Sequence, residues 1–150
     1  MDTTNQNSPA PVFLGEFVHA IDGKNRLTIP SQWRFEKEVE LFLFPSTSSQ
    51  CLKVMPRPEL DRIRADAAKL PGPQRAAFLR RFGSQGRQVT LDKNGRLSLP
   101  EEFCKQFKLS GEVTLSGAIE NFEVWNSNEW KAAHASTKAA GDALMSDFGL

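Results

Sequence analysis

Two arginine-bearing turns are the part of this sequence best suited to binding chemistry. Residues 21–34 read IDGKNRLTIPSQWR, and residues 91–104 read LDKNGRLSLPEEFC. In each segment an aspartate precedes an arginine by four residues, so its carboxylate can accept turn N–H groups and pair with the guanidinium. An arginine held in this way could bind an anion, although a salt bridge that only closes the turn is the alternative. The pairs are Asp22 with Arg26 and Asp92 with Arg96.

Further cations accompany both turns. Lys24 lies inside the first turn and Lys93 inside the second, while Arg34 ends the first segment where the second has Cys104. A matched pair of arginine turns on one chain suits a symmetric polyanion, because each turn could meet an equivalent part of it. The duplication therefore raises the case for anion binding over a purely structural salt bridge.

The residues needed for other chemistries are sparse. The chain has two histidines, His19 and His134, and no tyrosine, and the spacing brings neither histidine to a serine nucleophile or a metal. The adjacent carboxylates Glu101 and Glu102 are explained by the first turn of a helix, where the macrodipole favours acids. The sequence contains no glycine-rich phosphate loop. We therefore expect no enzyme activity, no catalytic residue, no small-molecule substrate and no cofactor.

The two cysteines, Cys51 and Cys104, lie far apart, without a CxxC motif or a histidine cluster. This spacing indicates neither a disulfide framework nor a zinc site, and it is typical of a reduced protein of the cytosol. No apolar run approaches the length of a membrane span. We therefore predict a cytoplasmic protein with no metal site and no membrane contact.

The elements that must position the turns are mainly strands. Alternating and apolar runs predict strands at 16–22, 26–30 and 40–45, with the first arginine turn between the first two. A short helix is expected over residues 31–38, with Ser31 as its cap.

These elements occur twice in the chain. Residues 52–60 fall on residues 122–130 at the offset of 70 that also relates the two turns, and a further helix is expected from about Glu59 and from about Glu129. A unit that cannot bury its own apolar face must pack on another, so two copies predict one intramolecular pseudo-dimer around a single core. The expected fold is mostly β with short helices, an α+β class.

The segments outside the two copies differ in composition. Residues 1–11 are polar and are expected to form a disordered arm, ahead of a first copy at 12–70. Residues 71–81 begin with Pro and Gly and predict a linker helix. A second copy is expected at 82–135, followed by an alanine-rich tail at 136–150 that is helical at first and frayed near its end.

Charge is unevenly distributed, although the net charge is +1. Residues 61–90 carry seven Lys or Arg against two Asp, and residues 91–130 carry four Lys or Arg against seven acids. The basic middle could be a nucleic-acid stripe, but the solvated face of an amphipathic helix is the expectation. Trp125 and Trp130 are expected to pack rather than to stack on bases.

An asymmetry between the turns follows from this charge distribution. Arg26 is expected to have Arg34 nearby, whereas Arg96 belongs to the acidic copy and has Cys104 at the equivalent place. Because acids repel DNA, we expect the first turn to contribute more to binding than the second.

Three segments together resemble the MraZ family of bacterial transcriptional regulators. These segments are VFLGEFVHAIDGKNRLTIPSQWR, LDKNGRLSLPEEF and NFEVWNSNEW, and the resemblance extends from about residue 12 to residue 130. It implies that each copy is an AbrB-type (SpoVT-AbrB) swapped-hairpin unit and that the two units form a pseudo-dimeric barrel. It also implies ring-like homo-oligomers that bind tandem operator repeats in double-stranded DNA. Such rings would act at the nucleoid, usually repressing the division and cell-wall gene cluster.

The resemblance also implies the DNA-binding residues. Two departures from the family pattern are present: Asn25 replaces the glycine that usually precedes the first arginine, and Cys104 replaces an arginine in the second copy. Asn tolerates a positive φ, so the first turn is expected to survive. The implied residues are Asp22, Lys24, Arg26, Arg34, Asp92, Lys93 and Arg96.

An interaction protein is the alternative function. The same small fold in related families forms the DNA-binding half of antitoxins that neutralise a protein partner through a tail, so the segment 131–150 could bind a partner. Such antitoxins usually carry one copy and dimerise, whereas this chain carries two.

Overall fold

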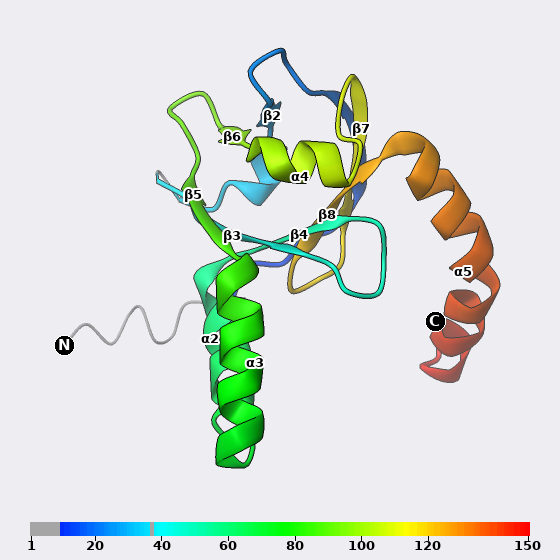
Figure 1. Cartoon of the computed structure of the whole chain (residues 1–150). Coiled ribbons are helices and arrows are strands. Elements are labelled where there is room, and N and C mark those ends of the chain that lie inside the picture. Colours follow the sequence, from blue (N-terminus) through cyan, green and yellow to red (C-terminus); the bar gives the residue numbers. More distant parts are fainter. Residues whose placement is uncertain (1–9, 37) are drawn as a thin grey trace.

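The computed structural model describes residues 10–36 and 38–150 and is an α+β fold built on antiparallel strands (Figure 1). The predicted arm at residues 1–11 lies almost wholly outside the described residues. In chain order the elements are β1 (Glu16–Ala20), β2 (Arg26–Thr28), η1 (Ser31–Trp33), β3 (Glu40–Pro45), β4 (Leu52–Met55), α2 (Arg57–Ala67), α3 (Gly72–Gln85), β5 (Arg87–Thr90), β6 (Arg96–Ser98), α4 (Glu101–Gln106), β7 (Glu112–Gly117), β8 (Phe122–Asn126) and α5 (Ser127–Asp147).

The strand order is two-fold symmetric. Six strands form one sheet in the order β1-β7-β8-β4-β3-β5, and β2 and β6 form a separate two-stranded ribbon. When each strand is replaced by its equivalent in the other copy, β1 by β5, β2 by β6, β3 by β7 and β4 by β8, the strand order becomes its own reverse. β1 of the first copy pairs with β7 of the second, and β5 of the second pairs with β3 of the first. The expected pseudo-dimer is therefore present, with its outer strands exchanged between the copies.

The barrel is not closed by hydrogen bonds among the described residues. The six-stranded sheet ends at β1 and β5, and the ribbon of β2 and β6 contacts both of these edge strands. Leu27 and Leu97, equivalent residues of the two copies, face each other in the ribbon and are fully buried. The ribbon thus covers the core from the open side of the sheet.

Aromatic side chains fill the core beneath the ribbon. The Trp33 ring stacks on Phe122 with 4.8 Å between ring centroids and meets Phe13 edge-on at 5.7 Å. Trp33 Nε1 donates a hydrogen bond of 3.0 Å to the carbonyl of Leu14, so the one polar atom of the ring is satisfied. Because Trp33 comes directly after the first turn and β2, this packing anchors that turn to the core.

The helix predicted over residues 31–38 is wrong in length. Among the described residues of this range, only Ser31–Trp33 form a helical turn, a 3-10 turn whose cap is Pro30 and which has no side-chain cap bond. The backbone is extended at Arg34, and the Phe35 ring lies 5.1 Å from Phe13. Phe35 remains exposed and touches the core only by this edge contact.

The offset between the copies also changes locally. Leu43 pairs with Val54, and Leu115 pairs with Val124, so β3 and β7 are related by 72 residues although β4 and β8 are related by 70. The second copy has a helix of six residues, α4, where the first has three in η1. The extra length is removed in the following hairpin loop, which spans 46–51 in the first copy and 118–121 in the second.

Helices α2 and α5 begin two residues before their predicted starts, because each directly follows a strand. The side chain of Asn126 caps α5 by accepting hydrogen bonds from the N–H groups of Asn128 and Glu129. The linker helix α3 runs four residues beyond the predicted range and folds back on α2, and its Phe82 stacks on Phe44 of β3 at 4.0 Å. The division of the chain into domains stays a proposal.

Candidate nucleic-acid interface

The two arginine turns have the same geometry. In the first, Asp22 Oδ1 accepts the backbone N–H groups of Lys24 at 2.9 Å and Arg26 at 2.8 Å, and Oδ2 accepts Arg26 Nε at 2.7 Å. In the second, Asp92 Oδ1 accepts the N–H groups of Asn94 and Arg96 at 2.9 Å, and Oδ2 accepts Arg96 Nε at 2.9 Å. The expected pairing of each aspartate with its arginine is confirmed.

Each carboxylate holds its arginine by one edge only. The hydrogen bonds of both guanidinium groups use Nε, and no bond to Nη1 or Nη2 occurs within the described part of the chain. The Arg26 and Arg96 side chains are 30% and 29% exposed, so part of each side chain reaches solvent. A guanidinium fixed at Nε and free at both Nη atoms can still form the bidentate contact that suits a phosphate or a guanine.

The electrostatics of the turns keep both aspartates ionised. The hydrogen bond from the Arg26 backbone N–H, assisted by the guanidinium, holds the pKa of the Asp22 carboxyl below its usual value. The equivalent N–H of Arg96 lowers the pKa of Asp92 in the same way. The salt bridges therefore persist at neutral pH, and each turn presents its arginine in one orientation.

The outward face of the ribbon carries both arginines together. Leu27 and Leu97 point into the core, so their strand neighbours point outward by the two-residue alternation of a strand. Arg26 pairs with Ser98 and Thr28 pairs with Arg96, which sets the two arginine Cα atoms about 7–8 Å apart on a diagonal. The sequence analysis did not include Thr28 and Ser98, although the alternation would have placed both beside the arginines.

The two turns are fastened to each other by their tips. The N–H of Ile29 donates to the carbonyl of Gly95, and the N–H of Leu99 donates to the carbonyl of Asn25, at 2.9 and 2.8 Å. Asn25 has φ 59° and Gly95 has φ 74°, so both occupy the left-handed region. The expectation that Asn25 preserves the first turn is confirmed. In Figure 1 the loops before β2 and before β6 project from the same end of the molecule.

The structure places Arg34 at the second turn, although it belongs to the first copy. A Cβ at Gly95 would lie 2.7 Å from Arg34 Cζ and 2.8 Å from its Cδ, so the arginine lies directly over the glycine. Arg34 also lines a cavity of about 270 Å³ with Asp92 and Lys93. The contacts of Arg34 that the structure shows are thus with the second turn, and its nearness to Arg26 stays a prediction. Crossing of the chain between the copies brings the first copy's cation to the acidic copy's turn.

The basic linker helix lies away from this interface. In Figure 1 helices α2 and α3 extend from the end of the body opposite the arginine turns. Every arginine of α3 is exposed, in agreement with a solvated face: Arg75, Arg80 and Arg81. Trp125 is buried and meets Trp130 edge-on at 5.7 Å, so the packing expected of this pair is confirmed.

The cysteines and acids offer no second site. Both thiols are buried, and burial is the main cause that raises the pKa of Cys51 to about 12 and that of Cys104 above its usual value. Across residues 10–36 and 38–150, no three His, Cys, Asp or Glu side chains are grouped as metal ligands would be. No helix in the same ranges combines the length and apolar character needed to cross a bilayer.

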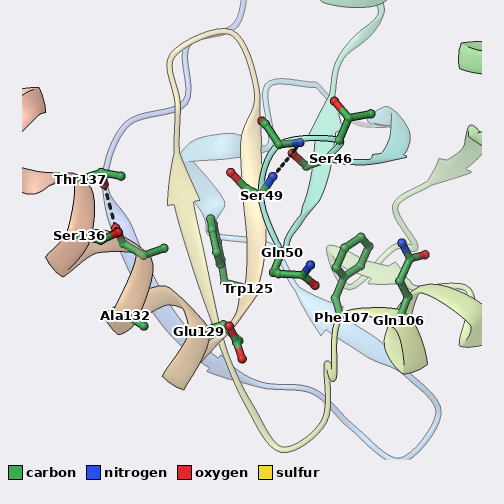
Figure 2. A pocket seen from close by; sticks show the side chains of 13 residues that line it. Ser46, Ser49, Gln50, Gln106, Phe107, Trp125, Glu129, Ala132, Ser136 and Thr137 are labelled. Atoms are coloured by element: carbon green, nitrogen blue, oxygen red, sulfur yellow. Dashed lines mark hydrogen bonds between the residues drawn. The ribbon is translucent and has the colours of Figure 1, made fainter.

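A polar groove of about 520 Å³ lies between the loop 46–50 and the first turns of α5 (Figure 2). Its hydroxyl groups are used locally: Ser46 Oγ accepts the N–H of Ser49, and Thr137 Oγ1 donates to the carbonyl of Ala133. The groove contains no arginine or lysine. It is therefore a poor match for a nucleic acid.

A family model and several known proteins named as transcriptional regulators resemble this chain. A family model described as "MraZ protein, putative antitoxin-like" matches residues 84–144. A protein of Desulforamulus reducens named Transcriptional regulator MraZ is 32% identical over 139 residues, which cover 91% of this chain and 97% of that protein. Relatives with the same name from Clostridium tetani and Syntrophobacter fumaroxidans are 30% and 31% identical and cover 80% and 81% of this chain, and 85% and 84% of their own lengths.

Proposed function

The chain belongs to the MraZ family, and we propose that it regulates transcription by binding double-stranded DNA through the outward face of the β2–β6 ribbon. The single observation that carries this proposal is the paired geometry of Arg26 and Arg96. Each arginine is fixed at Nε by its own aspartate, and each keeps both Nη groups free on one solvent-facing surface. The relatives are named as transcriptional regulators, which supports DNA as the partner of these arginines and gives no reason to expect an enzyme.

Each residue has a role in this proposal. Arg26 and Arg96 contact a phosphate or a base edge, and the neighbouring Lys24 and Lys93 add charge that attracts the DNA backbone. Arg34 adds a cation beside the second turn. Asp22 and Asp92 orient the arginines and do not contact DNA themselves, because a carboxylate facing a phosphate would be repelled.

Assembly supplies the affinity that one ribbon lacks. A single chain presents two arginines on a short ribbon, which is few contacts for specific DNA binding. A ring-like homo-oligomer on tandem operator repeats would multiply the contacts, because each further subunit binds at a high effective concentration. By the family resemblance, the operators lie before the division and cell-wall gene cluster, the effect is repression, and the protein acts in the cytoplasm at the nucleoid.

The test measures DNA affinity and thermal stability on the same variants. The probe is DNA from upstream of the protein's own gene, and the variants are Arg26→Ala and Arg96→Ala. Each should weaken binding by about 1–3 kcal/mol if the arginine reads a base, or should reduce the salt dependence by about one phosphate contact. Because Arg34 removes the expected charge deficit at the second turn, the two losses should be of similar size.

The matched control is Arg80→Ala, which removes an exposed arginine from α3 at the opposite end of the body. It should leave DNA affinity close to that of the parent protein. If Arg26→Ala and Arg96→Ala stay folded and bind DNA as before, the arginines only brace their turns and the proposal is wrong.

The antitoxin-type alternative has one observation in its favour. Helix α5 leaves the body with a fully exposed end, as a partner-binding tail would. The opposing observation is that one chain already supplies both halves of the pseudo-dimer, whereas an antitoxin of this fold usually forms it from two chains. Purification of the protein as a stable complex with an unrelated protein that masks α5 would favour the alternative.

A further inference from the structure

Helix α5 continues far beyond its contact with the body. Trp130 in its first turns packs on Trp125, but every residue from His134 to Leu150 is exposed. We call residues 139–150 the α5 tip. Its large apolar side chains are exposed by 51–80%, and the first three share one helix face by their spacing: Leu144, Met145, Phe148 and Leu150.

The tip is also acidic. It carries Asp142 and Asp147 and no lysine or arginine, but Asp142 Oδ2 pairs with Lys138 Nζ at 2.7 Å, which leaves Asp147 as the acid without an ion pair among the described residues. Four large apolar side chains gathered at one helix end form an exposed apolar patch of the kind that marks an interaction site. The tip therefore has the composition of an amphipathic segment that docks in a groove.

A groove of matching character lies beneath α3. It has a volume of about 340 Å³, and Phe44, Phe82 and Phe78 form a ladder along it with centroid distances of 4.0 and 5.3 Å. Met55 and Ile63 line the same groove, which we call the α3 groove. Phe78, Phe82 and Ile63 are only half-buried, so the aromatic surface can accept further apolar side chains.

The α3 groove is basic where the tip is acidic. Arg81 lines it, and within the described residues its guanidinium forms no ion pair. The cations of neighbouring α2 differ, because Arg57, Arg62 and Arg64 each pair with a carboxylate. Helix α3 carries three arginines and no acid, so its charge is available to a partner.

The tip does not occupy the groove of its own chain. In Figure 1 α3 and α5 descend from different sides of the body, and no residue of α5 lines the α3 groove. We propose that the α5 tip of one copy docks in the α3 groove of a second copy, with Leu144 and Phe148 on the aromatic ladder and Asp147 beside Arg81. This contact rests on the self-association in the proposed function and assigns it to two surfaces.

The contact joins two different surfaces, so each copy offers one tip and one groove. Such a head-to-tail interface leads to a closed ring when the rotation between copies permits closure, and to an open filament otherwise. The arginine turns project from the end of the body opposite α3, so the docked tip leaves the ribbon free for DNA (Figure 1).

The experiment is sedimentation of the full chain at micromolar concentration. Leu144→Asp should raise the dissociation constant for assembly about tenfold or more, because a carboxylate would enter an apolar groove. Arg81→Glu should weaken assembly by repelling the acidic tip, and adding Asp147→Arg to it should restore part of the loss. The matched controls are Ala139→Asp, on the opposite side of α5 from Phe148, and Arg80→Glu, which lies outside the groove, and both should assemble as the parent does.

Mixing gives the sharpest outcome. The Leu144→Asp chain keeps an intact groove and the Arg81→Glu chain keeps an intact tip, so a mixture should form two-chain complexes and nothing larger. Assembly of Leu144→Asp at the parent's concentration would overturn the contact, as would a parent protein that stays monomeric. A parent that binds DNA while monomeric spares the proposed function, and a parent that assembles through these surfaces without binding DNA refutes only that function.

Discussion

Replacement of Gly95 by alanine tests two properties of this glycine. The first is its positive φ, and the second is the space above it, which the Arg34 side chain occupies. Gly95 has φ 74°, a region that costs a residue with a Cβ about 1–2 kcal/mol. The new Cβ would also lie 2.7 Å from Arg34 Cζ, so the arginine must move. We expect Gly95→Ala to lower the free energy of unfolding by about 1–2 kcal/mol, or the melting temperature by about 2–8 °C for a chain of this size.

The same change should weaken DNA binding although it removes no charge. If Arg34 neutralises a phosphate from its position over Gly95, then its displacement should reduce the slope of log affinity against log salt by up to about 0.9, the value of one phosphate. Gly95→Ala should therefore reproduce part of the effect of Arg34→Ala. In the double variant the two losses of affinity should not add, because the arginine is already absent.

The matched control is Gly23→Ala in the first turn. A Cβ at Gly23 would meet no atom within 4 Å, and its φ is not in the left-handed region. This variant should be neutral or more stable by up to about 1 kcal/mol, because alanine restricts the unfolded chain. Equal stability losses at Gly95 and Gly23 in chemical denaturation would refute the backbone argument. If Gly95→Ala weakens DNA binding as much in the Arg34→Ala protein as in the parent, then Gly95 does not act on DNA binding by positioning Arg34.

Three further outcomes are expected. DNA affinity should fall steeply with added salt, because each neutralised phosphate releases counterions, and a flat salt series by fluorescence anisotropy would exclude Arg26 and Arg96 as phosphate contacts. The pKa values of Asp22 and Asp92 are lowered in the folded state, so their contribution to stability is complete above about pH 4 and is lost as the pH falls through the folded-state values. The melting temperature of the double variant Asp22→Asn, Asp92→Asn should therefore depend less on acid pH than that of the parent protein. The Cys51 thiol, whose pKa is raised to about 12 by burial, should react with a thiol reagent only on unfolding, and rapid labelling at neutral pH would contradict its burial.

The sequence predicted the architecture well because the repeat indicates both the elements of each copy and the packing of the two copies around one core. The duplicated turn and strand pattern required two units that share a core, and the α+β class and the pseudo-dimer are confirmed. The resemblance to the MraZ family is confirmed by relatives that match most of the chain. Propensity failed directly after Trp33, because the backbone of Arg34 is extended and the 3-10 turn does not continue there.

The site contact that sequence spacing did not predict comes from connectivity. Asp22 and Asp92 bond to their own arginines over four residues, so sequence spacing was sufficient to predict those pairs. Arg34 is eight residues from Arg26 in sequence but lies over Gly95, because the two copies interlock. Sequence spacing predicts which residues are neighbours within one copy. The pairing of strands between the copies decides which arginine turn Arg34 contacts.

The exchange of outer strands has a consequence for synthesis on the ribosome. β1 pairs with β7, so Glu16 must wait for Ser116, a separation of one hundred residues. At about 5–20 residues per second, translation takes about 5–20 s to supply that partner. During this interval the first copy has an unpaired β1, and Leu27 of β2 has no partner strand until β6 is made, so apolar surface of the nascent chain stays exposed. Until β7 emerges, another nascent chain of the same polysome can supply its own β7 instead, which makes interchain strand exchange the characteristic misfolding risk of this fold.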